Sequence, residues 1–211
     1  MQTQEDGQGK WSIFLPMKHF ALGKSRLLEL SETHRISLIK CMANDVIQQL
    51  LQVPEVHTIT VVGSDHRDLI KLPDHRVNSS IPYPSQSINI DVSSVLGEER
   101  KVAILLPDLP GLTHHEISIA LNFANTRSTS FIRDYKGVGS TFYMCTQREK
   151  FNPKFGADSA KLHLETGAIE IVDSRFDGLR RDCDSLSDLA EFEVASLGRS
   201  TRLFMEQQMH K

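Results

Sequence analysis

The sequence predicts a three-layer α/β domain built on a mostly parallel β-sheet. Over about the first 125 residues, short apolar runs rich in β-branched residues alternate with segments of helical periodicity. The run VAILL at residues 102–106 is apolar throughout, which is typical of a strand buried on both faces of a sheet. Such alternation places helices on both faces of a parallel sheet.

The first part of the chain divides into strands and helices in order. Strands are predicted at residues 11–17 (WSIFLPM), 57–64 (HTITVVGS), 76–83 (RVNSSIPY) and 101–106 (KVAILL). Helices are predicted at residues 31–51, 87–99 and 113–126. Ser31 is a suitable N-cap for the first, and Thr113 followed by Glu116 forms a capping-box pattern for the last.

The second part of the chain is more mixed. Strands are predicted at residues 140–146 (STFYMCT) and 169–175 (IEIVDSR), and helices at residues 158–168 and 185–198, the latter capped by Ser185 or Ser187. Residues 200–211 form a last helix or a loose end. We expect residues 1–10 to be a disordered leader and residues 11–211 to form a single domain.

Composition narrows the class of protein. The 211 residues are 39% hydrophobic and 24% charged, with a net charge of -3 and a pI of about 6.3, so a general nucleic-acid surface is not expected. No run approaches the roughly 18 apolar residues of a membrane span, and the polar start resembles neither a signal nor a transit peptide. Three widely spaced cysteines indicate reduced thiols and a cytoplasmic protein.

A cation-rich loop follows the first strand. Gly23-Lys24-Ser25 has the ending of a P-loop, but Lys18 stands where that motif requires its first glycine. A glycine there lets the backbone wrap a phosphate, so a P-loop is not expected. Lys18, Lys24 and Arg26 instead offer three cations within nine residues, suited to a triphosphate. Solvated surface side chains are an equally good explanation.

Two acidic segments are candidates for a metal site. Asp108 directly follows a buried strand, and one or two carboxylates together with substrate phosphates are the ligands that Mg²⁺ usually takes. A turn at Leu109-Pro110 capped by Asp108 is the alternative. Asp182 and Asp184 stand together before a helix, where they hold a metal or merely cap the helix.

Three further polar stretches lie near predicted strand or helix ends: Gly63-Ser64-Asp65, residues 137–141 (GVGST) and residues 155–163 (FGADSAKLH). The last two offer glycine turns, backbone amides and hydroxyl groups, which suit an anion. Glycine turns are commoner than anion sites, so neither stretch is specific by itself.

Six segments in this order resemble the 2-phospholactate/phosphoenolpyruvate guanylyltransferases of deazaflavin coenzyme biosynthesis: LPMK…GKSRL, SIN, LLPDLPGL, GVGSTFYM, FGADSAKLH and RDCDSLSDL. The resemblance implies a Rossmann-like nucleotidyltransferase fold with a mixed sheet and a Mg²⁺-dependent enzyme. It also implies the reaction: the phosphate of a three-carbon phosphoacid attacks the α-phosphorus of GTP, and pyrophosphate leaves. The expected partners are GTP and the phosphoacid, without nucleic acid or membrane, and a homodimer is a candidate assembly.

The resemblance also implies roles for individual residues. Lys18, Lys24, Ser25 and Arg26 hold the triphosphate, Asn89 contacts the nucleotide, and Thr141, Gly156 and Ser159 cradle the phosphoacid. Asp108 and an aspartate of RDCD, Asp184 in preference to Asp182, bind magnesium. Lys18, Lys24 and Asp108 carry the catalysis. No protein nucleophile is needed, because the attacking phosphate is already an anion.

The chain departs from the family pattern at Gly23, at Pro107, after Asn89 and in the segment FIRDYK at residues 131–136. These departures leave three points open: the choice between GTP and CTP, the identity of the acid, and a phosphonate or sugar phosphate as acceptor. A nucleotide-binding protein without catalytic activity is the non-enzymatic alternative.

Overall fold

The computed structural model describes residues 9–17, 27, 30–69, 74–82 and 87–209. They contain a seven-stranded sheet in the order β3-β2-β1-β4-β6-β5-β7. The strands are β1 (Trp11–Pro16), β2 (Val56–Val62), β3 (Val77–Ser80), β4 (Lys101–Leu105), β5 (Thr129–Arg133), β6 (Ser140–Cys145) and β7 (Ile169–Glu170). The helices are α2 (Glu32–Leu50), α3 (Ile88–Val95), α4 (His114–Ala124), α5 (Ser159–Glu165), α6 (Leu186–Ala190) and α7 (Arg199–Met209). Short 3₁₀ turns cover His66–Asp68, Arg148–Lys150 and Val194–Ser196.

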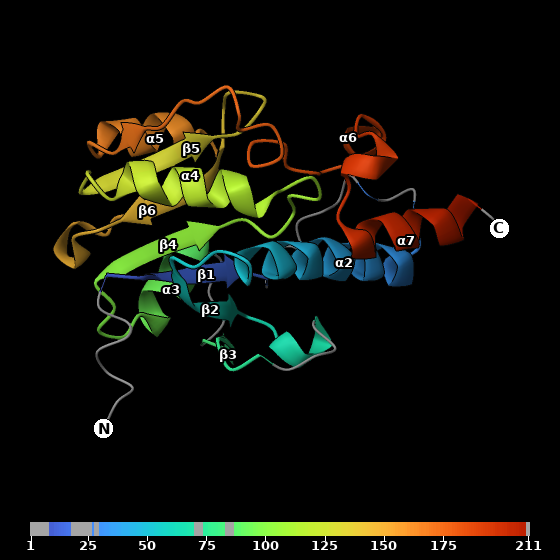
Figure 1. Cartoon of the computed structure of the whole chain (residues 1–211), viewed down its shortest axis with the longest axis horizontal. Coiled ribbons are helices and arrows are strands. Elements are labelled where there is room, and N and C mark those ends of the chain that lie inside the picture. The colour runs from blue at the N-terminus through green and yellow to red at the C-terminus, as the bar shows by residue number, and fades with distance from the viewer. Residues whose placement is uncertain (1–8, 18–26, 28–29, 70–73, 83–86, 210–211) are drawn as a thin grey trace.

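The sheet is mixed and mostly parallel, as the sequence predicts. Strands β3, β2, β1 and β4 pair in parallel, β7 pairs in parallel with β5, and only β6 runs the other way, antiparallel to β4 and β5. The carboxyl ends of six strands therefore meet at one edge of the sheet, together with the start of β6. The backbone N–H of Leu106 donates to the carbonyl of Thr141 there, at 2.9 Å. In Figure 1 the strands β1, β2 and β4 point toward this edge, on the side of α6 and α7.

Helices cover both faces of the sheet, which gives the predicted three layers. Alternate residues of β1 separate the two faces: Ile13 and Leu15 pack with α2, α4 and α7 in the main apolar core, whereas Phe14 packs with Val92 of α3. A third apolar cluster joins β5 and β6 to Ala160 of α5. Helices α2 and α7 lie against one another, as Figure 1 shows.

The helix starts follow local rules and confirm the predicted caps. The Ser31 hydroxyl accepts from the His34 N–H at the start of α2. Thr113 and Glu116 form the predicted capping box of α4, and Ser185 caps α6 in the same way with Asp188.

Three features of the second half differ from the predictions. Strand β5 is not in the predicted set, and it forms an antiparallel hairpin with β6. Strand β7 has two residues, because the chain turns back at Asp173, whose carboxylate accepts the Arg175 N–H at 2.9 Å. The helix predicted at residues 185–198 ends at Ala190, and a separate 3₁₀ turn follows. Residues 199–209 form a true last helix, α7.

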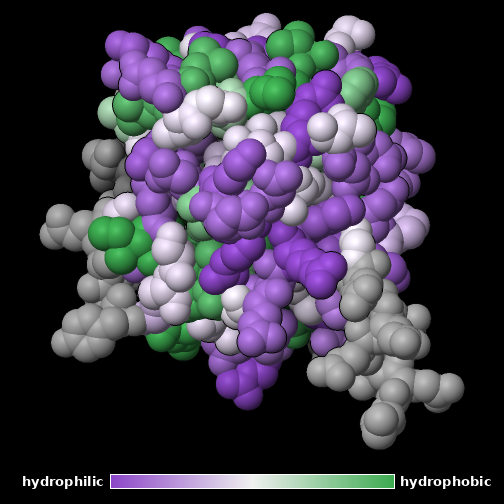
Figure 2. Space-filling view, turned by 90° about the vertical axis from the view of Figure 1, so that its left-hand side faces the viewer, coloured by the Kyte–Doolittle hydropathy of each residue, from purple (hydrophilic) through white to green (hydrophobic). Residues whose placement is uncertain are grey.

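The opposite edge of the sheet, where the parallel strands begin, faces the viewer in Figure 2. Hydrophilic residues predominate on this face, with apolar residues in small groups between them. Within the described ranges, none of the helices has the length and apolarity needed to cross a membrane.

Candidate active site

Three carboxylates from distant parts of the chain gather at the carboxyl edge of the sheet. Asp108 follows β4, and Asp182 and Asp184 precede α6; one oxygen of each lies within 4.8 Å of the other two. Asp108 is 3% exposed, and the other two are half-buried. Like charges this close repel each other, and a hard divalent cation is the ligand that relieves the repulsion. The three oxygen donors therefore fit Mg²⁺ or Mn²⁺. We call them the acid cluster.

Backbone hydrogen bonds hold the segment that contains Asp182 and Asp184 beside Asp108. The N–H of Cys183, between the two later aspartates, donates to the carbonyl of Asp108 at 2.9 Å. Leu179 is held at both ends: its carbonyl accepts from the Thr141 hydroxyl at 2.7 Å and its N–H donates to Glu116 at 3.0 Å. The segment before α6 is thus attached to β6 and α4, which fixes the position of Asp182 and Asp184 relative to Asp108.

A glycine pair makes this approach possible. A Cβ built on Gly178 lies 2.0 Å from the carbonyl oxygen of Gly111, a distance that no side chain tolerates. The two backbone segments therefore meet directly. Arg180 adds further anchors, because its guanidinium donates to the carbonyls of Arg133 and Asp134 at 3.1 Å.

Asp188 supports the acid cluster by binding the backbone next to it. No role for this residue was predicted from the sequence. Its Oδ2 accepts the backbone N–H groups of Asp184 and Ser185, both at 2.9 Å. These bonds hold Asp184 where its carboxylate joins the acid cluster. Asp188 is the last aspartate of the segment RDCDSLSDL, and its place in that segment is the feature of the sequence that could have indicated a role.

Lys136 places a cation beside this arrangement. Its Nζ lies 3.3 Å from Asp188 and 3.9 Å from Asp184. Burial acts to lower the pKa of Lys136, but the hydrogen bond to Asp188 and the nearby charges of Asp182 and Asp184 outweigh it and raise the pKa. Lys136 therefore stays protonated and offsets part of the negative charge.

The glycine turn at residues 137–139 binds an anion from within the chain. The carboxylate of Asp134 accepts the N–H groups of Val138 at 2.9 Å and Gly139 at 2.7 Å. A Cβ on Gly139 would lie 2.6 Å from Asp134 Oδ2, so the close approach requires glycine. The predicted suitability of this turn for an anion is thus realised, and Asp134 occupies those two amides.

The residues predicted to cradle the phosphoacid lie on neighbouring elements. Thr141 in β6 is fully buried, and its hydroxyl donates to Leu179 as described above. Ser159 opens α5 with 2% exposure, and its hydroxyl lies 3.3 Å from that of Ser140. Gly156 has φ of +130°, in the region that favours glycine. Their predicted role toward a substrate stays a prediction.

Asn89 makes a two-sided contact with the backbone near Gly156. Its Oδ1 accepts the Phe155 N–H at 2.9 Å, and its Nδ2 donates to the Phe155 carbonyl at 3.0 Å. The carboxamide keeps one N–H and one lone pair for a ligand. The predicted nucleotide contact is therefore compatible with this geometry and stays a prediction. Lys18, Lys24, Ser25 and Arg26 lie outside the described residues, and their roles also stay predictions.

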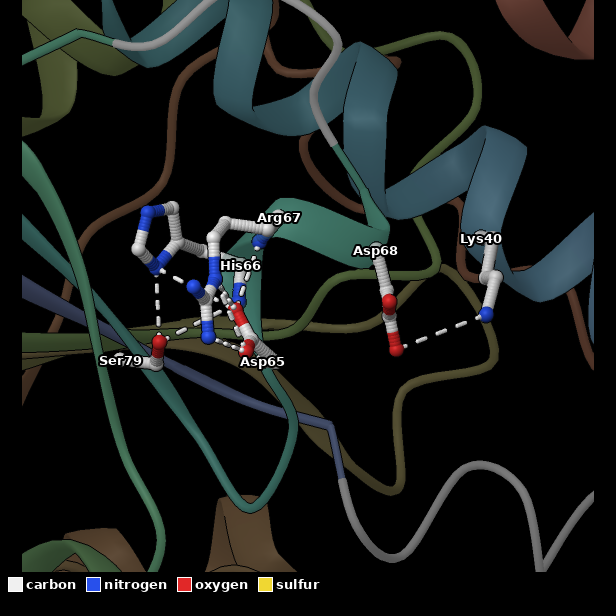
Figure 3. Close-up of polar contacts among 6 residues, drawn as sticks. All are labelled: Lys40, Asp65, His66, Arg67, Asp68 and Ser79. Carbon is white, nitrogen blue, oxygen red and sulfur yellow. Dashed lines mark hydrogen bonds and ion pairs between the residues drawn. The ribbon is translucent and has the colours of Figure 1, made fainter.

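The polar side chains of the loop after β2, residues 63–68, form hydrogen bonds and ion pairs with nearby residues. Arg67 donates to Asp65 through its guanidinium at 2.5–3.0 Å and through its backbone N–H at 2.9 Å (Figure 3). These hydrogen bonds lower the pKa of Asp65 to about 2. His66 contacts Ser79 of β3 at 2.7 Å, and Lys40 pairs with Asp68 at 3.8 Å (Figure 3). Among the described residues, the acid cluster draws no member from this loop.

Comparison with known proteins identifies the family. A sequence model of the family described as guanylyl transferase CofC like matches residues 11–209. The chain belongs to this family. Phosphoenolpyruvate guanylyltransferases from Streptosporangium roseum and Thermomonospora curvata are each 29% identical to it, over 93% and 90% of the chain and 90% and 86% of their own lengths. The protein is a nucleotidyltransferase enzyme.

Solved structures of the same fold are more distant in sequence. A protein from Desulfovibrio desulfuricans described as a nucleotide-diphospho-sugar transferase has a TM-score of 0.67 at 14% identity, covering 95% of this chain and 96% of that one. A Mycobacterium tuberculosis protein in complex with manganese has a TM-score of 0.53 at 12% identity, covering 86% and 96%. The fold is therefore the Rossmann-like nucleotidyltransferase fold that the sequence predicts.

Proposed function

We propose that this CofC-like enzyme transfers GMP from GTP to a small phosphoacid, with phosphoenolpyruvate as the first candidate and 2-phospho-L-lactate and 3-phosphoglycerate as the others. The observation that carries the proposal is the acid cluster at the carboxyl edge of the sheet, where α/β enzymes bind nucleotides. The names of the curated relatives support both the guanylyl donor and phosphoenolpyruvate.

The reaction needs positioning and charge neutralisation rather than a protein nucleophile. An oxygen of the acceptor phosphate forms a bond to the α-phosphorus of GTP. The bond from that phosphorus to the bridging oxygen breaks, and pyrophosphate leaves with the bonding electrons. The attacking oxygen is already anionic, so no side chain has to remove a proton from it.

The carboxylates of Asp108, Asp182 and Asp184 hold the divalent cation in this proposal, with Mg²⁺ as the physiological ion. When bound, the cation neutralises the charge that develops on the phosphate oxygens. The manganese complex of the structural neighbour supports a divalent ion on this fold. Asp188 keeps Asp184 in place through its backbone amide.

In this proposal GTP binds on one side of the acid cluster and the phosphoacid on the other. Lys18, Lys24, Ser25 and Arg26 follow β1 in the sequence and hold the triphosphate, and Asn89 contacts the nucleotide. Thr141, Gly156 and Ser159 bind the phosphoacid on the side of β6 and α5. The product is an activated acid suited to transfer onto a deazaflavin alcohol, and such a transfer is the next step we propose.

Pyrophosphate release tests the proposal. The purified protein is incubated with Mg²⁺, one nucleotide (GTP, CTP, ATP or UTP) and one acid (phosphoenolpyruvate, 2-phospho-L-lactate or 3-phosphoglycerate), and the product is identified by mass. We expect pyrophosphate and a guanylylated acid only with GTP. Release with CTP in preference to GTP, or no release with any of the acids, contradicts the proposal. Asp108→Asn is the inactive reference, and Asp65→Asn is its matched control at the same edge of the sheet.

A further inference from the structure

Residues 152–158, which we call the acceptor loop, connect the turn after β6 to α5, and three side chains hold their backbone. The Asn152 N–H donates to the Tyr143 hydroxyl at 3.2 Å, and the Lys154 N–H donates to His163 Nε2 at 2.8 Å. The backbone of Phe155 is bound on both sides by Asn89. These side chains come from β6, α5 and α3, so tertiary contacts set the path of the acceptor loop.

His163 is fully buried at the centre of this arrangement. Its ring stacks on Tyr143 at 4.9 Å between centroids and also contacts Phe131 and Phe155. Nε2 accepts a backbone N–H, and therefore it carries no hydrogen. A neutral ring then has its hydrogen on Nδ1, which donates to the Ser140 hydroxyl oxygen at 2.9 Å. Burial, and secondarily the charge of Lys154, lowers the pKa of His163 to about 4, which agrees with a neutral ring.

The hydrogen-bond chain continues from His163 to the expected acceptor site. Ser140 Oγ receives the Nδ1–H of His163 and also the hydroxyl of Ser159 at 3.3 Å. Ser159 opens α5 directly after Gly156 and Asp158, which have φ of +130° and +54°. A backbone with two residues in the left-handed region keeps its shape only when its surroundings hold it. His163 thus contacts both the acceptor loop and the hydroxyl pair Ser140–Ser159.

We propose that His163 is a positioning residue for the phosphoacid: Nε2 fixes the acceptor loop, and Nδ1–H orients the hydroxyl pair that faces the acid. The identity of the ligand as a phosphoacid rests on the proposed function. His163 lies on the side of β6 and α5, so its effect falls on the acid and leaves GTP unchanged. Asn89 holds the same loop from the side of α3.

Two substitutions separate the two contacts of the ring. The side-chain amide of His163→Asn occupies the place of Nδ1–H and retains a donor toward Ser140, but it does not reach Lys154. His163→Gln places an acceptor near the position of Nε2 and loses the donor toward Ser140. We expect each to raise KM for the phosphoacid about tenfold, the size of one lost hydrogen bond. KM for GTP, and kcat at saturating acid, stay within about twofold.

The control for stability is Val46→Ala, in α2 on the other face of the sheet. It lowers Tm through lost packing and leaves both KM values unchanged. Ser140→Ala is the second variant in case a change at the buried His163 prevents folding; it removes the partner of Nδ1–H and is expected to raise KM for the acid alone. Unchanged KM for the acid in all folded variants, or an equal rise in KM for GTP, overturns the proposal.

Measurements that need no enzymatic turnover test the role of His163 independently of the proposed function. Amide hydrogen exchange is followed at Lys154, and the imidazole ¹⁵N shifts of His163 are measured by NMR. We expect a proton on Nδ1 and none on Nε2, faster Lys154 exchange in His163→Asn, and unchanged exchange in His163→Gln. If the wild type releases no pyrophosphate, the proposed function fails, while these measurements still show whether His163 holds the acceptor loop through Nε2. A proton on Nε2, or unchanged Lys154 exchange in His163→Asn, shows that the positioning role is wrong.

Discussion

Two groups of aspartates lie at the same edge of the sheet and behave in opposite ways. Asp65, after β2, is paired with Arg67 two residues away, and that pair is exposed to solvent. The acid cluster joins Asp108 to Asp182 and Asp184, which come from a different part of the chain, and the Nζ of Lys136 lies 3.9 Å from Asp184. In the first group, the charge of Asp65 is neutralised by Arg67, two residues away in the sequence. The second gathers three carboxylates at a fixed place in the fold.

The difference shows how a candidate binding site is distinguished from ordinary surface charge. An ion pair between neighbours in sequence needs no tertiary structure and contributes little to stability or function. A group of like charges forms only when backbone contacts hold it against its own repulsion. The contacts of Cys183 and Leu179 provide that support.

The largest effect is expected for Asp108→Asn. In the proposed mechanism this substitution removes one of the carboxylates that hold the cation, so we expect kcat for pyrophosphate release to fall by about 10²–10³. Initial rates at saturating GTP and acid measure this effect. Retention of more than about a tenth of wild-type kcat shows that Asp108 does not hold the catalytic ion.

The next largest effect is the pH dependence of the free energy of unfolding that arises from the buried His163. The pKa of His163 is lowered from 6.5 to about 4, so its contribution to stability is complete above pH 6.5 and is lost as the pH falls to 4, because the unfolded chain takes up the proton first. The loss is about 3 kcal/mol by pH 4. Urea unfolding at pH 7 and pH 4 measures it. His163→Gln lacks this group, and an equally steep pH dependence in that variant counts against the assignment.

Removal of the metal is expected to affect the acid cluster alone. Binding of Mg²⁺ or Mn²⁺ to the folded state at a hundred times Kd stabilises it by about 2.7 kcal/mol, which raises Tm by about 5–11 °C in a chain of this size. Chelator reverses the shift. Asp108→Asn loses the response and Asp65→Asn retains it; a response lost in both variants places the ion elsewhere.

A smaller effect is expected for Asp188→Asn. The amide oxygen can still accept both backbone N–H groups that Oδ2 accepts, but it is uncharged and therefore a weaker acceptor, and the side chain no longer offers a charge to Lys136. Partners that orient a metal ligand typically change affinity by about 10–100-fold, and we expect the lower end. Titration with Mn²⁺, followed by electron paramagnetic resonance, gives the Kd. An unchanged Kd shows that Asp184 needs no support from Asp188.

The smallest effect is expected for Asp65→Asn. The pair with Arg67 is solvent-exposed, and its loss leaves Tm, Mn²⁺ affinity and kcat at wild-type values. The same three assays used above measure these quantities. A fall of tenfold or more in kcat places the loop after β2 in the active site and removes the distinction drawn between the two groups.

Local features of this fold were predictable from the sequence. Ser31, Thr113 and Ser185 cap helices through bonds to residues three positions on, and such patterns are visible without a structure. Buried strands such as β4 were equally clear from their apolar runs. The acid cluster was predicted through the order of motifs and their resemblance to a family, because no spacing rule joins Asp108 to residues so far along the chain.

The missed features depend on partners distant in sequence. Strand β5 contains Thr, Phe and Ile but also Ser and Arg, and it is fixed by pairing with β6 and β7. The amides of the glycine turn are occupied by Asp134, and the carboxamide of Asn89 binds the backbone of Phe155; a motif alone shows the donors but not which acceptor they find. The roles of the basic loop, residues 18–26, remain predictions.

The direct contact of Gly111 with Gly178 has a consequence for biosynthesis. A ribosome makes the chain from its amino end, and Asp108 leaves it well before Gly178, Asp182 and Asp184. Strands β1 to β4 can pair during this interval, since all four precede Gly111. At that stage the nascent chain contains Asp108 of the acid cluster but neither Asp182 nor Asp184. The acid cluster can therefore assemble only after synthesis has passed Gly178 and the two later aspartates.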